Sequence, residues 1–114
     1  MQTLLVITTM PDPTSAERLA RALVEARLAA CVNVLAPCRS VYRWQDAIET
    51  AEEVPLLIKT SKARYPELEA AIRAQHPYAL PEIVAFEPAR GLADYLAWVA
   101  AETDAPTVQS GEGR

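Results

Sequence analysis

The chain has little of the material from which metal and phosphate sites are built. Its 114 residues include one histidine, two cysteines and three glycines. Cys31 and Cys38 show neither CxxC nor zinc-finger spacing, and no Gly-rich phosphate loop, GxSxG, HExxH or EF-hand motif is present. Enzymatic catalysis therefore has little support from motifs, and the two cysteines are interpreted as reduced thiols of a cytoplasmic protein.

Basic clusters and long apolar runs are also missing. The net charge of −4 with scattered basic residues argues against a protein that binds nucleic acid through phosphates. The apolar run at residues 4–7 follows no positively charged segment and is far too short to cross a bilayer. The sequence thus predicts neither nucleic acid nor a membrane as the main partner.

What the chain does have is enough apolar material for one globular domain. Hydrophobic residues make up 51% of the sequence, which suffices for a core without disulfides. The last residues contain Pro, Gly, Ser and Gln without periodicity. We expect one domain over residues 1–103 and a flexible tail over residues 104–114.

Hydrophobic periodicity predicts a regular order of elements. Strands are expected at residues 2–9, 30–35, 40–44, 48–60 and 83–86, with a hairpin turn at 45–47. Helices are expected at residues 13–28, 63–75 and 92–102. Asp12 and Gly91 are the predicted N-caps, and Glu17–Arg21 and Glu69–Arg73 are the predicted ion pairs.

This βαββαβ order with a terminal helix predicts an α+β, ferredoxin-like antiparallel sheet. Pro55 should occupy an unpaired position, which indicates a hairpin longer than the rest of the sheet. Crossover helices cover only one face of such a sheet, yet the strands are apolar on both faces. We therefore expect self-association to cover the second face.

The stretch from His76 to Glu82, HPYALPE, is the most distinctive in the chain. Its two prolines, Pro77 and Pro81, restrict the backbone, so the only histidine should lie in a stiff elbow just past a helix. A histidine there can bind metal or carry protons. The alternative is a plain helix-to-strand connection in which His76 favours the helix C-terminus electrostatically.

Lys59 lies in an apolar strand and needs a partner or an exit to water. Glu52, Glu53 and Glu82 are the candidate acids for an ion pair or subunit contact. The alternative is that Lys59 binds an anionic ligand.

Cys31 is expected to be a small buried hydrophobic residue. Two alternatives remain open: a nucleophile with His76 as its base, or a mixed metal site with His76 and Glu82. Sulfur and nitrogen donors would suit copper or zinc.

Aromatic side chains mark two predicted protrusions. Tyr42 and Trp44 lie on the hairpin, and Trp98 lies with Tyr95 on the last helix. Large aromatics at such positions are typical of interface anchors, with core packing as the alternative.

Several segments resemble the CutA divalent-cation tolerance family, in the order that the family has them. They are LVEARLAACVN at 23–33, SVYRWQ at 40–45 with EV at 53–54 and IKT at 58–60, HPY at 76–78 with PEIV at 81–84, and YLAW at 95–98. The resemblance covers about residues 4–102. It implies a homotrimer similar to the PII signalling proteins, in which long hairpins wrap neighbouring subunits and a cleft lies between chains.

The resemblance places Cys31, Lys59, His76, Tyr78 and Glu82 around or near that cleft, and Tyr42, Trp44 and Trp98 at the trimer interface. It implies copper or another divalent metal as the ligand, no organic cofactor and no enzymatic reaction. His76, Cys31 and Glu82 are the candidate metal ligands.

The chain departs from some copper-associated members of that family at two ligand positions. Thr8 stands where those members have a cysteine, and Gln75 where they have a second histidine. Asp46 also replaces a glycine common in the hairpin turn, a change that aspartate tolerates. Loss of two soft ligands predicts weak to moderate metal binding. The alternative hypothesis is a PII-like regulatory module that binds a small anionic molecule in the intersubunit cleft through Lys59.

Overall fold

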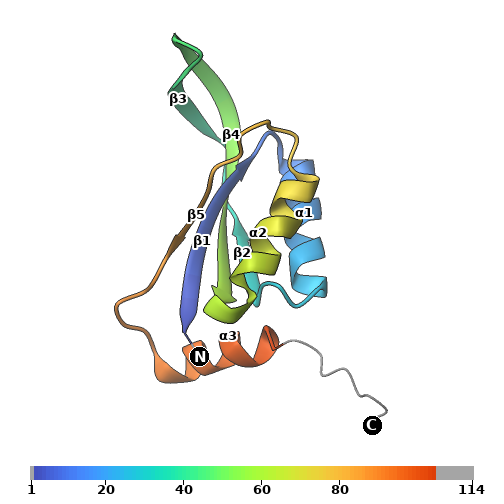
Figure 1. The fold of residues 1–114 in the computed structure, drawn as a ribbon, viewed down its shortest axis with the longest axis vertical. Coiled ribbons are helices and arrows are strands. Elements are labelled where there is room, and N and C mark those ends of the chain that lie inside the picture. Colours follow the sequence, from blue (N-terminus) through green and yellow to red (C-terminus); the bar gives the residue numbers. More distant parts are fainter. Residues whose placement is uncertain (1, 105–114) are drawn as a thin grey trace.

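The elements of the chain follow the predicted order in a mixed α+β fold. The computed structural model describes residues 2–104, so the tail predicted for residues 104–114 lies outside the described residues except for Asp104. In chain order, the elements are β1 (Thr3–Met10), α1 (Pro13–Glu25), β2 (Cys31–Val34), β3 (Cys38–Trp44), β4 (Ala47–Ser61), the 3₁₀ turn η1 (Lys62–Arg64), α2 (Tyr65–Gln75), β5 (Ile83–Phe86) and α3 (Ala93–Glu102) (Figure 1).

Helix α1 begins as predicted and ends earlier than predicted. The Asp12 carboxylate accepts a hydrogen bond of 2.7 Å from the Ser15 amide, which confirms the N-cap, and Arg21 pairs with Glu17 at 3.2 Å. The helix stops at Glu25 because Arg27 adopts a left-handed conformation with φ of 59°. That conformation reverses the chain toward β2.

Two predictions for the other helices are wrong. Glu69 accepts a hydrogen bond of 2.7 Å from the Tyr65 hydroxyl, and the structure shows no Glu69–Arg73 ion pair among its described residues. The N-cap of α3 is Leu92, whose carbonyl accepts from the Leu96 amide at 3.0 Å. A Cβ at Gly91 would lie 3.0 Å from Leu96 Cδ2, so a larger residue there would require the Leu96 side chain to shift slightly.

The strands form an antiparallel sheet in the order β2-β4-β1-β5. The first half of β4 leaves this sheet and pairs only with β3, which produces the extension at the top of Figure 1. A two-residue turn closes the hairpin, with φ of 49° at Gln45 and 66° at Asp46. Positive φ at both positions is the geometry that matches the twist of a tight hairpin.

Pro55 marks the point where the neighbour of β4 changes. Its carbonyl accepts from the Leu35 amide at 2.9 Å, just after β2 ends at Val34. The nitrogen of a strand residue points to the same side as its carbonyl. The missing N–H of Pro55 therefore lies beside the interruption between β2 and β3, where it costs no ladder hydrogen bond.

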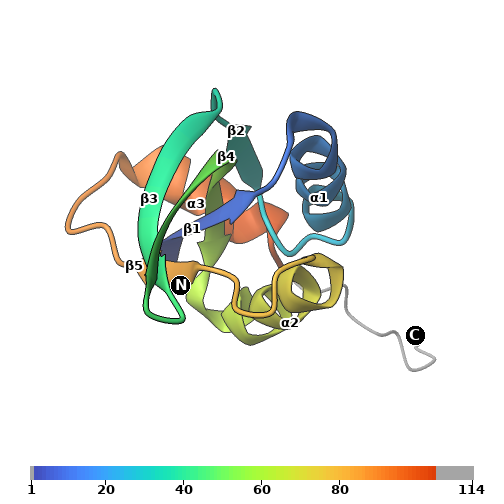
Figure 2. The same cartoon turned by 90° about the horizontal axis from the view of Figure 1, so that it is seen from above.

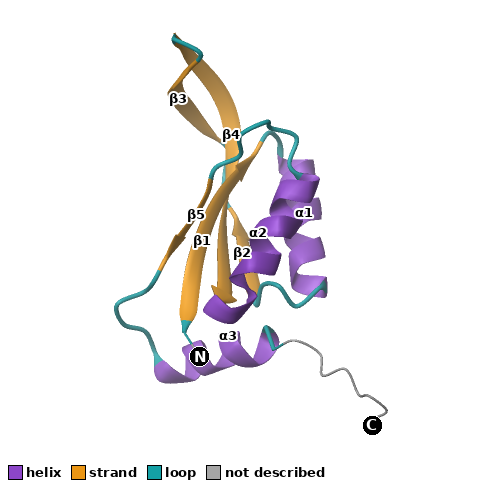
Figure 3. Cartoon of the chain, in the orientation of Figure 1, coloured by secondary structure: helices purple, strands orange, loops and turns teal. Residues whose placement is uncertain are grey.

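The sheet has one covered face and one open face. Figure 2 shows α1 and α2 side by side on the same face, and Figure 3 shows α3 at the end of the sheet where β1 begins. Under α1 and α2, Leu4, Val6, Leu56 and Ile58 are at most 7% exposed and form the centre of the core. No helix among residues 2–104 lies over the opposite face.

Candidate functional site

The open face of the sheet is formed by the strand residues that alternate along each strand with the core residues. Strand register places Leu5 and Ile7 of β1 beside Phe86 and Val84 of β5, and Ile7 beside Leu57 of β4. Val84 and Phe86 are 43% and 51% exposed, while the other three are half-buried. An apolar surface of this kind on a sheet is typical of a face that packs against a partner.

Lys59 also lies on the open face, opposite Cys31 in the register of β2 and β4. Its ammonium donates to Asn33 Oδ1 and lies 3.8 Å from Cys31 Sγ. The predicted pairing with Glu52, Glu53 or Glu82 does not form within the chain: no carboxylate of the described residues lies within ion-pair distance of Lys59. Lys59 is thus a half-buried cation with neutral partners.

His76 lies immediately after α2, in the extended conformation that the following proline favours (φ −86°, ψ 132°). Its Nε2 lies 2.7 Å from the Thr9 carbonyl oxygen, and its Nδ1 accepts from the Tyr78 amide at 3.2 Å. A carbonyl can only accept, so Nε2 carries the proton and Nδ1 is the unprotonated nitrogen. Both ring nitrogens are therefore engaged.

Tyr78 and Glu53 continue these contacts toward the hairpin. The Tyr78 ring lies 4.8 Å from the His76 ring, centroid to centroid. Burial, together with the neighbouring Glu53 carboxylate, raises the pKa of Tyr78 to about 12, so its hydroxyl remains protonated and can donate at neutral pH. Glu53 also accepts from Thr9 Oγ1 at 3.2 Å. This end of the sheet is a connected polar cluster.

The structure brings some of the predicted site residues together and separates others. Lys59 and Cys31 meet on the open face, and His76 and Tyr78 meet at the elbow, while Glu82 is exposed. Within residues 2–104, no group of three or more His, Cys, Asp or Glu side chains could hold a metal ion. A site made of Cys31, His76 and Glu82 therefore remains a prediction that requires more than one chain.

Two surface pockets of the described chain are not lined by the predicted site residues. One lies between α1 and β2 and is lined by Ala20, Arg21, Val24, Glu25 and Val32. Another lies near the start of β1 and is lined by Gln2, Thr3, Glu87, Pro88 and Leu96.

The predicted interface aromatics are all partly exposed in the single chain. Tyr42 and Trp44 on the hairpin are 40% and 38% exposed, and Trp98 on α3 is 43% exposed. Trp98 lies against Tyr95 with ring centroids 5.7 Å apart. Core packing does not explain these side chains within one chain.

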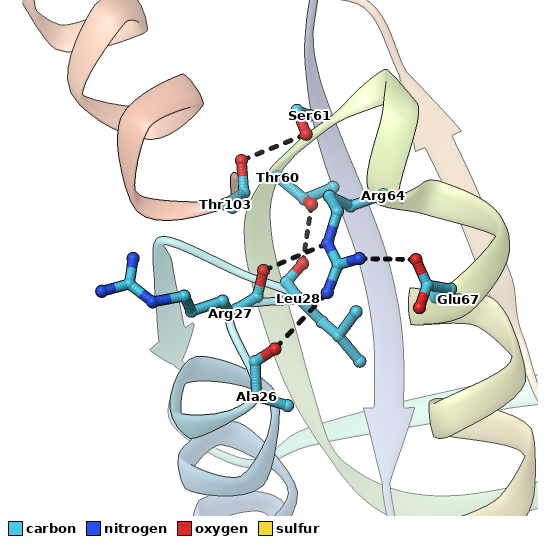
Figure 4. A network of polar contacts seen from close by, with 8 residues as sticks. All are labelled: Ala26, Arg27, Leu28, Thr60, Ser61, Arg64, Glu67 and Thr103. Atoms are coloured by element: carbon cyan, nitrogen blue, oxygen red, sulfur yellow. Dashed lines mark hydrogen bonds and ion pairs between the residues drawn. The ribbon is translucent and has the colours of Figure 1, made fainter. Parts of the chain in front are cut away.

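Sequence reasoning missed Arg64, a buried arginine that holds the end of α1 (Figure 4). Its guanidinium donates to the carbonyls of Ala26 and Arg27 at 3.5 and 3.4 Å and pairs with Glu67 at 2.5 Å. Nothing in the local sequence signals these contacts, because their acceptors are backbone carbonyls more than 35 residues away.

Comparison with known proteins identifies the family. The family model described as "CutA1 divalent ion tolerance protein" matches residues 4–102 of this sequence. The "Divalent-cation tolerance protein CutA" of Thermus thermophilus is 44% identical over 98 residues, covering 86% of this chain and 95% of the relative.

Solved structures agree with this match. CutA from Xylella fastidiosa superposes with a TM-score of 0.88 at 44% identity, covering 91% of this chain and 100% of that chain. A CutA from Archaeoglobus fulgidus, described as periplasmic, gives a TM-score of 0.86 at 34% identity and covers 90% and 99% of the two chains. None of the helices formed by residues 2–104 has the length and apolar character needed to span a membrane. The chain belongs to the CutA1 divalent ion tolerance family.

Proposed function

We propose that the chain is the subunit of a homotrimeric divalent-cation tolerance protein with a ferredoxin-like, PII-like architecture. The observation that carries this proposal is the open face, where Leu5, Ile7, Leu57, Val84 and Phe86 have no partner within the described chain. A second copy is the simplest cover for such a face.

The hairpin supports the same proposal. Beyond the main sheet, β3 and β4 pair only with each other and expose Val41 and Ile48 at 66% and 63%. An isolated two-stranded ribbon is marginally stable by itself. A neighbouring subunit that packs against this ribbon would bury its apolar residues together with Tyr42 and Trp44.

The proposed ligand is copper or another divalent ion, bound weakly to moderately between subunits. The family description supports a role in tolerance to divalent ions. Cys31 is half-buried and Glu82 is exposed, so both can meet donors from another chain. His76 can join such a site only if a ring nitrogen gives up its present hydrogen bond.

Calorimetric titration of the assembled protein with Cu²⁺ and Zn²⁺ tests the metal role. We expect saturable binding that weakens by about tenfold or more, 1.4 kcal/mol, in Cys31→Ser or Glu82→Gln. Ser40→Ala, on the hairpin, is the control and should leave the affinity unchanged. Absence of saturable binding by the wild-type assembly would contradict the metal role.

A second candidate function rests on Lys59. A half-buried ammonium that contacts Asn33 and Cys31, and no carboxylate among residues 2–104, can receive a small anion in a cleft between subunits. A thermal-shift screen with carboxylates and phosphates should find an anion that stabilises the wild type but not Lys59→Gln. The exposed Lys62→Gln serves as the matched control, since Lys62 already contacts Glu87 at 3.5 Å.

We propose the cytoplasm as the location, supported by the two free thiols of Cys31 and Cys38. The Archaeoglobus fulgidus relative, described as periplasmic, represents the other possibility. Fractionation of cells that express the full chain distinguishes the two compartments.

A further inference from the structure

The chemistry of His76 limits what its ring can bind. An imidazole coordinates a metal through an unprotonated nitrogen whose lone pair points at the ion. In this chain the Nδ1 lone pair faces the Tyr78 amide, and Nε2 directs its proton at the Thr9 carbonyl. Neither nitrogen offers a free lone pair, so coordination would require a hydrogen bond to break and, at Nε2, a proton to leave.

The neighbouring positions do not compensate for this. The Thr8 side chain is fully buried on the helix-covered face, in register with Leu56 and Ile83, and its hydroxyl has no hydrogen-bond partner among the described residues. A neutral hydroxyl and the Gln75 amide are poor ligands for copper. The donors at this end of the sheet therefore do not fit a copper site.

The same atoms do form a connected series of contacts, the elbow cluster, made by Thr9, Glu53, His76 and Tyr78. His76 donates to the Thr9 carbonyl, the Thr9 hydroxyl donates to Glu53, and the Tyr78 amide donates to His76. The Tyr78 and His76 rings also lie 4.8 Å apart, centroid to centroid, and the Glu53 carboxylate is among the groups that raise the pKa of Tyr78. Three segments meet in the elbow cluster: the end of β1, the elbow and the base of the β3–β4 hairpin.

The position of Glu53 places the elbow cluster at the base of the hairpin. Glu53 is the last residue of β4 whose partner, Cys38, lies on β3, and the next residue, Val54, pairs with Met10 of β1. The elbow cluster therefore lies at the point where the hairpin leaves the main sheet. In Figure 1 the connection between α2 and β5 passes this point.

From this geometry we infer that His76 is a positioning residue, which clamps the elbow and the hairpin base to β1, and that it is not a metal ligand in this chain. The inference goes beyond the proposed function, since it rests only on contacts within one chain. It reassigns the only histidine and directs any divalent-ion site to other donors.

Two variants separate the clamp from a ligand. His76→Gln keeps an N–H at the distance of Nε2 for the Thr9 carbonyl and removes the imidazole, whereas His76→Ala removes both contacts. Amide hydrogen exchange of Tyr78, read by NMR on the assembled protein, should accelerate by about tenfold or more in His76→Ala. Because Gln75 is exposed and adjacent, Gln75→Ala is the control and should not change that rate.

Nitrogen-15 spectra of the wild-type ring provide a measurement that needs no variant. At pH about 8, where free imidazole is neutral, we expect Nε2 protonated and Nδ1 unprotonated. This pattern and the Tyr78 amide signal should persist when Cu²⁺ is added in slight excess, and His76→Gln should bind Cu²⁺ as the wild type does. The opposite tautomer, or early loss of the His76 ring signals together with a tenfold weaker Cu²⁺ affinity in His76→Gln, would overturn the inference. If no variant or wild type binds divalent ions, the proposed metal role fails, while the tautomer and the Tyr78 exchange rate still decide the clamp.

Discussion

The two faces of the same sheet are built from similar residues and have different surroundings. On the helix-covered face, Val6, Leu56 and Ile58 are fully buried beneath α1 and α2. On the open face, Val84 and Phe86 remain 43% and 51% exposed although they are equally apolar. Apolar burial contributes about 25 cal/mol per Å² wherever it occurs. The covered face therefore stabilises the fold of one chain, whereas the open face can contribute fully only when chains assemble.

The largest effect is expected from truncating a residue of the covered face. Ile58→Ala should cost about 2–5 kcal/mol of unfolding free energy, because it leaves a cavity in a fully packed core. Leu57→Ala changes the adjacent residue on the open face. Its loss of unfolding free energy should be smaller in dilute protein and should grow as the protein concentration rises, because assembly buries that face. Chemical denaturation at several protein concentrations measures both losses of unfolding free energy. Equal losses that do not depend on protein concentration would contradict the distinction between the two faces.

Arg64 supports the covered side through hydrogen bonds rather than apolar contact. Arg64→Met removes the donors to the Ala26 and Arg27 carbonyls and should cost about 1.5–3 kcal/mol. Hydrogen exchange should show the loss first at the end of α1. The exposed Arg21→Met, which breaks only a surface ion pair, is the control and should change stability by at most about 1 kcal/mol.

Two threonines on the covered face should respond differently to the same substitution. Thr60→Val removes a buried hydrogen bond of 2.7 Å to the Leu28 carbonyl and should cost about 1–2 kcal/mol. Thr8→Val replaces a buried hydroxyl that has no hydrogen-bond partner among residues 2–104, and it should leave stability unchanged or raise it by about 1 kcal/mol. Thermal unfolding of the pair measures the difference, and a loss in both variants would mean that Thr8 has a polar partner.

Much of the fold follows from the sequence because periodicity and caps are local signals. The predicted strand at residues 83–86 is β5 to the residue, and Asp12 caps α1 as expected. The end of α1 was missed because the left-handed turn at Arg27 has no glycine or asparagine to mark it. The βαββαβ order correctly indicated that the two crossover helices cover only one face of the sheet, while the self-association predicted from the apolar second face stays a prediction.

The candidate site was less predictable because its partners are distant in sequence. Pro77 fixed the extended elbow, but the acceptor of His76 is a backbone carbonyl 67 residues away, which no side-chain pattern reveals. The charge of Lys59 suggested an acidic partner. The pairing of β2 with β4 instead places Asn33 where its side chain accepts from Lys59. Motifs indicated which residues matter, and only the fold determined what each one contacts.

We propose that the open face is the surface through which chains assemble, and one matched pair of variants tests this proposal most directly. Val84 on the open face and Val24 on α1 are 43% and 42% exposed, so lysine at either position removes a similar apolar surface. Light scattering coupled to size exclusion should give a trimer for the wild type and Val24→Lys, and a folded monomer for Val84→Lys. A trimer that survives Val84→Lys, or a wild-type chain that is monomeric at micromolar concentration, would contradict this account.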